Sequence, residues 1–281
     1  MEAPSVRVSG RDSLAPDAAD ATRTLGAWRR WVNLAGRASS PAPWLVAAAL
    51  IVHSIAGAGP HRVEVGRFTA PAEPDALPAG WEPLTFRKIP RSTRYSVVRD
   101  GEGWVLKAES EAAASALYRR LELDLHAHPR LTWRWKIDNV LVKGDARRRE
   151  GDDYPARVYV TFRYDPAQAS PWQKAKYEAY RQLYGAYPPH AALNYIWDNR
   201  LPPGTMLDNA YTDRAKMIVV RSGAAEVGRW VTETRNVVDD YRRLFGGDPP
   251  PIAGVAVMTD TDDTAERAVA WYDALAFLAP D

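Results

Sequence analysis

The stretch Leu131–Ile137 reads LTWRWKI, and its residues alternate strictly between large apolar and polar types. Side chains of a β-strand point in turn to the two faces of a sheet, so this pattern predicts a strand with one buried face. Ala156–Arg163 (ARVYVTFR) has the same alternation, with valine and phenylalanine on the apolar side. Both stretches therefore predict a half-buried β-sheet.

Outward from these two stretches, most of the chain favours strands. A hairpin is predicted where a glycine-containing turn at Asp100–Gly103 separates Ser96–Arg99 from Trp104–Ala108. Further strands are predicted near Val63–Val65 and at Leu121–Leu125, Leu193–Trp197, Met217–Arg221, Arg229–Thr232, Ile252–Thr259 and Ala268–Phe277. The expected core residues are Trp104, Trp133, Trp135, Val158, Val160, Phe162, Val255 and Val257.

Two segments have helical spacing instead. Pro171–Tyr184 carries tyrosines three and four residues apart. Asn236–Phe245 groups its apolar residues on one side, with Asn236 as N-cap and Gly246 as the stop. The sequence thus predicts an all-β fold, an antiparallel β-sandwich of jelly-roll type with one or two short helical insertions.

The N-terminal part has the pattern of a leader. Trp44–Ile55 (WLVAAALIVHSI) is mostly apolar, follows several arginines and precedes the small residues Ala56-Gly57-Ala58. A membrane span needs about 20 such residues, so this run predicts a secretion signal rather than a stable transmembrane span. We expect cleavage after Ala58, with residues 1–58 as leader, residues 59–281 as one sandwich domain, and a periplasmic or secreted location.

Composition excludes several classes of function. The 281 residues include no cysteine, which excludes disulfides, thiolate zinc sites and cysteine nucleophiles. Net charge is +2 and no long basic run occurs, so a nucleic-acid partner is not expected. Phosphate-binding glycine loops, nucleophile elbows and dinucleotide fingerprints are missing from the sequence, so no organic cofactor is expected.

Long segments carry a family resemblance. They are WRWKID (Trp133–Asp138), EGDD (Glu150–Asp153), LNYIWDNRLPPGT (Leu193–Thr205), YTDRAKMIVVRSG (Tyr211–Gly223), GRWVTETRNVVDDYRRLFG (Gly228–Gly246) and GVAVMTDTDDT (Gly254–Thr264). In this order they resemble the bacterial family called domain of unknown function 3047. The resemblance implies an exported bacterial protein, and it does not indicate any particular activity.

A looser similarity is to jelly-roll carbohydrate-binding modules of the galactose-binding type. It concerns the helix at Asn236–Phe245, the strand Ile252–Thr259 and the terminal Trp271–Asp273. This similarity implies the same type of sandwich.

The polar faces of the two alternating stretches are the first candidate site. If the two strands are neighbours, Arg134, Lys136, Arg157 and Tyr159 share one cationic surface. Guanidinium binds carboxylate in a bidentate manner, and neither strand carries a carboxylate on that face, so an acidic glycan is the expected partner. The alternative is an ordinary solvated sheet face, on which Arg157 would be exposed.

Polar and aromatic residues also gather in two later segments. Trp197, Asn199 and Tyr211 are the ligand-binding candidates there, accompanied by Asn194, Arg200, Asn209, Asp213 and Arg214. Segments of this composition often line a site. Alternatively, they form turns in which Asn and Asp satisfy their own backbone.

Two acidic segments offer metal or acid–base chemistry. Asp260 and Asp262 alternate as calcium ligands do, but the EF-hand glycine and distal glutamate are missing, so at most a structural Ca²⁺ is predicted. Glu150–Asp153 could bind Ca²⁺ or supply an acid and a base, or form a charged surface loop.

Together these observations favour an exported module that binds carbohydrate or a cell-envelope polysaccharide. One alternative is a polysaccharide-cleaving enzyme, a lyase or a glycosidase, in which an arginine neutralises a uronate and Tyr159 transfers a proton. Another is a protein-interaction module on the same fold.

Overall fold

Residues 61–280 are described by the computed structural model, apart from 74–75, 87, 102, 167–168, 172–173, 176 and 179–189. Their strands are β1 (Arg62–Gly66), β2 (Glu82–Thr85), β3 (Arg94–Asp100), β4 (Gly103–Glu111), β5 (Ala114–Arg120), β6 (Arg130–Ile137), β7 (Ala156–Phe162), β8 (Ala191–Asp198), β9 (Met206–Asn209), β10 (Thr212–Ser222), β11 (Val231–Asn236), β12 (Ile252–Asp260) and β13 (Arg267–Leu278). The helical elements among these residues include the 3₁₀ turn η2 (Arg149–Gly151) and the helix α3 (Val237–Phe245).

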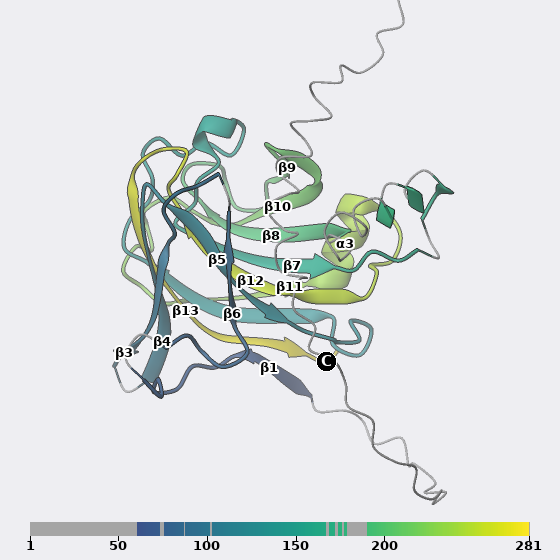
Figure 1. Cartoon of the computed structure of the whole chain (residues 1–281), viewed down its shortest axis with the longest axis horizontal. Coiled ribbons are helices and arrows are strands. Elements are labelled where there is room, and N and C mark those ends of the chain that lie inside the picture. Colours follow the sequence, from purple (N-terminus) through teal and green to yellow (C-terminus); the bar gives the residue numbers. More distant parts are fainter. Residues whose placement is uncertain are drawn as a thin grey trace, which may run out of the picture.

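These strands form two sheets, shown in Figure 1. Sheet A has the order β11-β6-β13-β4-β3, with β1 also paired to β13. Sheet B has the order β2-β5-β12-β7-β8-β10-β9. Neighbours in space are often far apart in sequence, so each sheet is assembled by long-range pairing.

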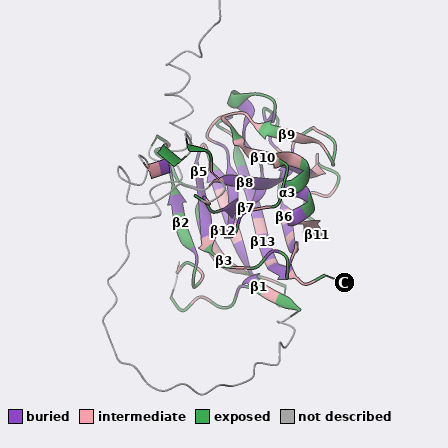
Figure 2. Ribbon diagram, turned by 90° about the vertical axis from the view of Figure 1, so that its right-hand side faces the viewer, coloured by how far each residue is buried: buried purple, intermediate pink, exposed green. Residues whose placement is uncertain are grey.

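The core lies between the inner faces of the two sheets. Trp133 of sheet A packs on Tyr195 of sheet B with 5.3 Å between ring centroids, and Trp135 packs on Trp197 at 5.8 Å. The apolar side of β7 joins the same core. Figure 2 shows the buried residues running along the strands of both sheets. The predicted all-β sandwich is confirmed.

Helix α3 closes one end of the sandwich and begins and ends as predicted. The Asn236 side chain accepts hydrogen bonds from the backbone N–H groups of Val238 and Asp239, and Gly246 follows the last turn with φ of 73°. Helix and sheet are tied by Asp240, which accepts from Tyr195 Oη (3.0 Å).

Several local predictions are wrong. Leu121–Leu125, which follows β5, is a loop. The neighbouring strand β12 begins at Ile252, so the pairing of β5 with β12 ends at Arg120. Trp104 is half-buried beside the turn of the β3–β4 hairpin, where Arg99 lies over its ring. The sandwich also contains one parallel pair, β8 with β10, because the intervening chain forms β9 on the far side of β10.

Other predictions fall partly or wholly outside the described residues. In Pro171–Tyr184, residues 171, 174–175 and 177–178 are helical, and the rest lie outside the description. The leader, its cleavage site at Ala58 and the domain boundary lie outside it as well. Within the described part of the chain, no helix is long and apolar enough to cross a membrane.

Candidate functional site

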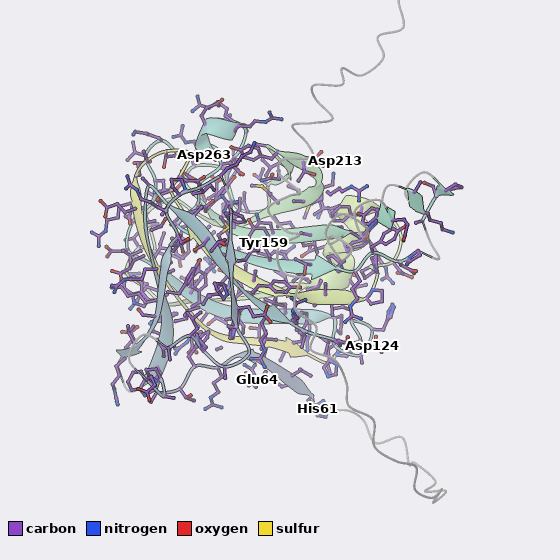
Figure 3. The ribbon with its side chains drawn as sticks, viewed as in Figure 1. His61, Glu64, Asp124, Tyr159, Asp213 and Asp263 are labelled. Atoms are coloured by element: carbon purple, nitrogen blue, oxygen red, sulfur yellow. The ribbon has the colours of Figure 1, made fainter. Side chains whose placement is uncertain are left out.

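A pocket of about 90 Å³ opens on the outer face of sheet B, the face turned away from the core. Alternation along β7 creates it: Val158 and Val160 enter the core, so Arg157 and Tyr159 point to the opposite side. The lining residues are Leu84, Phe86, Ala116, Asp152, Arg157, Tyr159, Ala191, Ala192, Asn209, Tyr211, Thr212, Arg214, Ala215, Met258, Asp260, Asp262 and Asp263. Figure 3 labels Tyr159 on sheet B and Asp263 in the β12–β13 turn.

Arg157 is the central cation of this pocket and is only 2% exposed. Its Nε donates to Asp260 Oδ1 (2.8 Å), its second terminal nitrogen donates to Asp260 Oδ2 and to the Asp152 carbonyl, and the first donates to Tyr159 Oη (3.1 Å). The guanidinium also lies 4.1 Å from the Tyr154 ring centroid. Arg157 was expected to be exposed and to have no carboxylate partner within the protein. Both expectations are wrong, because Arg157 is buried and pairs with Asp260 from β12.

Burial governs the ionisation of this group of residues. Desolvation alone would lower the pKa of Arg157, but the charge of Asp260 and its other neighbours holds that pKa well above its ordinary value. Burial raises the pKa of Tyr159 to about 12. At neutral pH the pocket therefore contains a fixed guanidinium and a protonated phenol.

Carboxylates form the polar rim of the pocket. Asp152 accepts from Asn209 Nδ2 (2.9 Å), and burial raises the pKa of Asp152. Tyr211 Oη donates to Asp263, 3.0 Å from both carboxylate oxygens. Burial, followed by the charges of nearby aspartates, raises the pKa of Asp263 to about 7. The rim is therefore rich in hydrogen-bonding carboxyl groups, and burial makes two of them, Asp152 and Asp263, harder to ionise.

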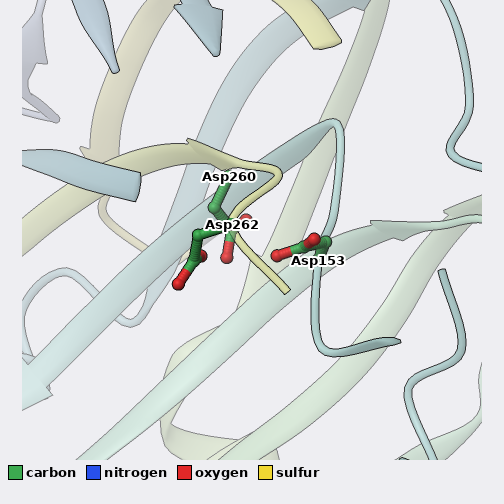
Figure 4. Close-up of side chains that lie close together, drawn as sticks. All are labelled: Asp153, Asp260 and Asp262. Carbon is green, nitrogen blue, oxygen red and sulfur yellow. The ribbon is translucent and has the colours of Figure 1, made fainter. Parts of the chain in front are cut away.

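Three aspartates beside the pocket could hold a metal ion. Ligand atoms of Asp153, Asp260 and Asp262 all lie within 4.8 Å of one another, and Figure 4 shows their carboxylates gathered together. Asp153 is oriented by the backbone N–H of Thr264 (2.6 Å). Hard oxygen ligands of this kind suit Ca²⁺. The sequence predicted two of these residues, and the calcium ion itself stays a prediction.

Arg134 and Lys136 lie on the outer face of sheet A, whereas Arg157 and Tyr159 lie on sheet B. The idea that the two strands are neighbours is wrong, because β6 pairs with β11 and β13 while β7 pairs with β8 and β12. Arg134 binds Asp273 (2.6 Å), and Lys136 binds Asp100 (2.7 Å). The four residues cannot form one surface.

The later polar segments divide between core and pocket. Trp197 is fully buried, with Nε1 donating to the Gly223 carbonyl (3.0 Å). Asn199 ties two loops together: its Oδ1 accepts from Leu141 N–H (2.7 Å), and its Nδ2 donates to the Asp153 carbonyl (3.0 Å). Among the three ligand-binding candidates of these segments, Tyr211 lines the pocket.

The acidic segment Glu150–Asp153 is part of the same site. Glu150 is exposed on η2, but Asp152 and Asp153 turn inward and are buried. Asp152 lines the pocket beside Arg157, so the acidic turn and the outward face of β7, alternatives in the sequence, meet here.

Part of the pocket had no signal in the sequence. Its apolar wall comes from Leu84, Phe86, Ala116 and Met258. The first two lie on and just after β2 and the third on β5, strands whose short or alanine-rich sequences resemble loops. Only the pairing of β2 with β5, and of β5 with β12, brings these residues into one pocket with Tyr211 and Asp263.

Fold and site together define a β-sandwich protein with a polar pocket on one outer sheet face. The chain belongs to the family described as "Protein of unknown function (DUF3047)", whose model matches residues 79–276. No significant match is found among curated protein sequences.

Solved structures give a likeness of fold. A family 29 carbohydrate-binding module complexed with mannohexaose is 9% identical, with a TM-score of 0.32, covering 77% of this chain and 89% of that one. The carbohydrate recognition domain of Emp47p is 12% identical, with a TM-score of 0.41, covering 79% and 96%. An exo-β-agarase is 12% identical, with a TM-score of 0.32, covering 78% of this chain and 25% of that enzyme. At these values the likeness concerns the sandwich alone.

Proposed function

We propose that this protein binds carbohydrate in the pocket on the outer face of sheet B. The observation that carries the proposal is the combination of an apolar wall with a rim of oriented hydrogen-bonding groups. A sugar presents apolar C–H faces and hydroxyls that both donate and accept, so it needs both kinds of surface. Arg157 and Asn209 are positioned by their own partners, which makes the rim preorganised.

The charge of the rim favours a neutral glycan over the acidic glycan expected from the sequence. Asp152, Asp260, Asp262 and Asp263 line the pocket, against the cations Arg157 and Arg214. Arg157 already shares its charge with Asp260. A uronate would find the Arg157 guanidinium already paired, and its charge would make the neighbouring carboxyl groups still harder to ionise, whereas carboxyl groups exchange hydrogen bonds readily with neutral hydroxyls.

The enzymatic alternative is less well supported. A lyase base must be deprotonated at working pH, and the Tyr159 phenol, with its pKa raised to about 12, stays protonated. Tyr159 could serve only as a proton donor. Release of new reducing or unsaturated ends, measured after incubation of the protein with the polysaccharides of the binding test, would establish cleavage.

A protein-interaction role has less support among the described residues. Only two large apolar side chains are exposed there, Leu77 (39%) and Val142 (79%). Large apolar patches are typical of protein-binding surfaces, and these two isolated residues do not form one.

The test is retardation of the protein in native gels that contain a polysaccharide. Galactomannan, hydroxyethylcellulose and glycol chitin are the neutral probes, and polygalacturonate and alginate are the acidic ones. We expect retardation by at least one neutral polymer, abolished in Tyr211→Ala. Trp271→Ala is the matched control, a half-buried aromatic on the outer face of sheet A. Loss in Trp271→Ala with retention in Tyr211→Ala would move the site to sheet A.

We also propose export, on the strength of the apolar run Trp44–Ile55 and the small residues that end at Ala58. The full-length gene expressed in a Gram-negative host should give periplasmic or secreted protein beginning near Gly59. Full-length protein confined to the cytosol would contradict this proposal.

A further inference from the structure

The loop from β6 to β7 presents an apolar side chain to solvent at its tip, the turn Leu141–Gly144. The Gly144 N–H donates to the Leu141 carbonyl and closes this turn (3.3 Å). Val142 is 79% exposed, about twice as much as Leu77, the other exposed large apolar residue among those described. A single exposed apolar side chain is common on protein surfaces, so the surroundings of Val142 decide what it means.

The backbone of the tip is held by side chains from two other loops. The Glu266 carboxylate accepts from the N–H groups of Val142 (3.1 Å) and Lys143 (3.0 Å). Arg200 donates to the Val142 carbonyl (2.6 Å). A backbone whose polar groups are paired can enter an apolar environment without the cost of an unsatisfied N–H or C=O. The tip is therefore fixed, and Val142 can leave water without stranding its own backbone.

Exposed cations accompany the tip. They form the basic patch, which consists of Lys143, Arg147, Arg148, Arg149 and Arg200. Arg147 and Arg148 share the carboxylate of Asp145, at 2.8 and 3.4 Å, but their side chains stay 62% and 60% exposed. Both guanidinium groups therefore remain accessible to a partner outside the chain.

The carboxyl groups of the same loop mostly lie away from its surface. Asp152 and Asp153 turn inward and are buried, and Asp145 is only 5% exposed. Asp138 and Glu150 are the exposed acids of the loop. The exposed part of the loop and the adjoining Arg200 therefore carry more cations than carboxylates.

An anionic phospholipid bilayer complements both features of this loop. Its headgroup phosphates attract lysine and arginine side chains, and its interfacial region accepts an apolar side chain. An acidic protein surface would complement the cations, but a single valine offers such a partner little apolar area to bury. The combination of Val142 with the basic patch therefore favours a lipid surface.

We propose that the tip of the β6–β7 loop docks this protein on an anionic phospholipid surface, with the basic patch at the headgroups and Val142 inserted between them. This inference goes beyond the proposed carbohydrate binding and does not depend on it. The Arg149 guanidinium lies 5.5 Å from the ring centroid of Tyr211, which lines the pocket. Docking would therefore bring the pocket close to the membrane surface.

A dye at the tip tests the insertion directly. Because the chain has no cysteine, Val142→Cys can be labelled at one position with the environment-sensitive dye nitrobenzoxadiazole. The labelled full chain is mixed with vesicles of equal parts phosphatidylglycerol and phosphatidylcholine, or of phosphatidylcholine alone. We expect the emission to rise and shift to the blue with the anionic vesicles only. The same dye on Leu77→Cys is the matched control and should not respond.

Sedimentation with the same vesicles tests the basic patch. We expect Lys143→Gln/Arg148→Gln to weaken binding to the anionic vesicles about tenfold or more, since each cation near such a surface adds to the attraction. Arg242→Gln/Arg243→Gln on α3 removes the same charge elsewhere and should bind nearly as the wild type does. Val142→Ser should also weaken binding, and Leu77→Ser should not.

These variants allow a comparison within one protein. They alter exposed positions and should fold as the wild type does, which circular dichroism checks. All keep the apolar run Trp44–Ile55, so any membrane binding by that run is common to them.

Three results would overturn the proposal. One is the absence of binding to the anionic vesicles, or a dye at position 142 that stays in water while the protein sediments with them. Another is equal weakening by the two double variants, which would leave only attraction by net charge. The third is sedimentation that Val142→Ser does not change, which would indicate an acidic partner of any kind rather than lipid. The proposed carbohydrate binding is tested separately, in the gels, and stands or falls there.

Discussion

Among single residues, Arg157 links the fold to the pocket. Its side chain and that of Asp260 are 3% and 4% exposed, so both charges are shielded from water. The pair joins β7 to the end of β12 and orients Tyr159 through the guanidinium. Its removal should therefore affect folding and not only binding.

We predict that Arg157→Ala lowers the free energy of unfolding by about 3–5 kcal/mol, because removal of one partner leaves an uncompensated buried charge. Urea unfolding followed by circular dichroism measures this loss. The double variant Arg157→Leu/Asp260→Leu should be less destabilised than the single one. A single variant within about 0.5 kcal/mol of wild type would mean that the pair is solvated.

The sequence predicted which way the Arg157 side chain points but not its surroundings. Alternation along β7 is local, so the outward direction was readable from Val158 and Val160. Asp260 lies 103 residues further on, and only the pairing of β12 with β7 brings it near. Short-range patterns carry no information on such a partner.

Among the connecting elements, the loop from β6 to β7 contributes Asp152 to the lining of the pocket. Asp145 anchors this loop: its N–H donates to the Gly151 carbonyl (2.8 Å), and its carboxylate accepts from Arg147 Nε (2.8 Å). Hydrogen bonds from Arg147 lower the pKa of Asp145 to about 2.

This pKa shift predicts an acid-sensitive contribution to stability. An unfolded aspartate titrates near 3.9, so the stabilisation by Asp145 is complete above about pH 4 and is lost as the pH falls towards 2. The difference in unfolding free energy between wild type and Asp145→Asn should shrink over that interval, as measured by urea unfolding. A difference that stays constant from pH 6 to pH 2 would contradict the assigned ion pair.

The turn from β12 to β13 carries the predicted calcium ligands. If Asp153, Asp260 and Asp262 hold Ca²⁺, millimolar CaCl₂ should raise the melting temperature, because an ion that binds only the folded state stabilises it. Asp262→Asn should abolish that rise, and Asp239→Asn on the exposed face of α3 should not. A melting temperature that does not respond to CaCl₂ or EDTA would exclude the site.

Strands and helices with a strong hydrophobic periodicity were predictable from the sequence, and short strands were not. The hydrophobic periodicity extends over seven or more residues in β6, β7 and α3. For this reason the predicted ends of these elements are close to the observed ones. β9 has only four residues, most of them half-buried, and takes its shape from pairing with β10. Leu121–Leu125 shows the reverse: an alternating pattern without a strand beside it stays a loop.

In the whole molecule, aromatic side chains of the two sheets pack against each other in the core. We predict that Trp135→Ala costs about 3–5 kcal/mol of unfolding free energy, as expected when a large core side chain is removed. The half-buried Trp271→Ala on the outer face of sheet A is its control and should cost less. A melting temperature of Trp135→Ala equal to that of wild type would contradict the described core.

The sandwich class followed from strand content, but the assignment of strands to sheets did not. Trp133 and Val158 both point into the core, as predicted, yet they enter it from opposite sheets. Inward residues of two sheets look alike in sequence. For the same reason their outward neighbours, Arg134 and Arg157, seemed to share a face.

Filling the pocket tests the central claim most directly. Ala192→Trp places a large ring in the pocket, and Lys107→Trp adds the same ring to the outer face of sheet A as a matched control. Isothermal titration with the neutral glycan that retards the wild type should show binding lost in Ala192→Trp and retained in Lys107→Trp, both variants remaining folded by circular dichroism. Unchanged binding by a folded Ala192→Trp would show that the pocket is not the carbohydrate site.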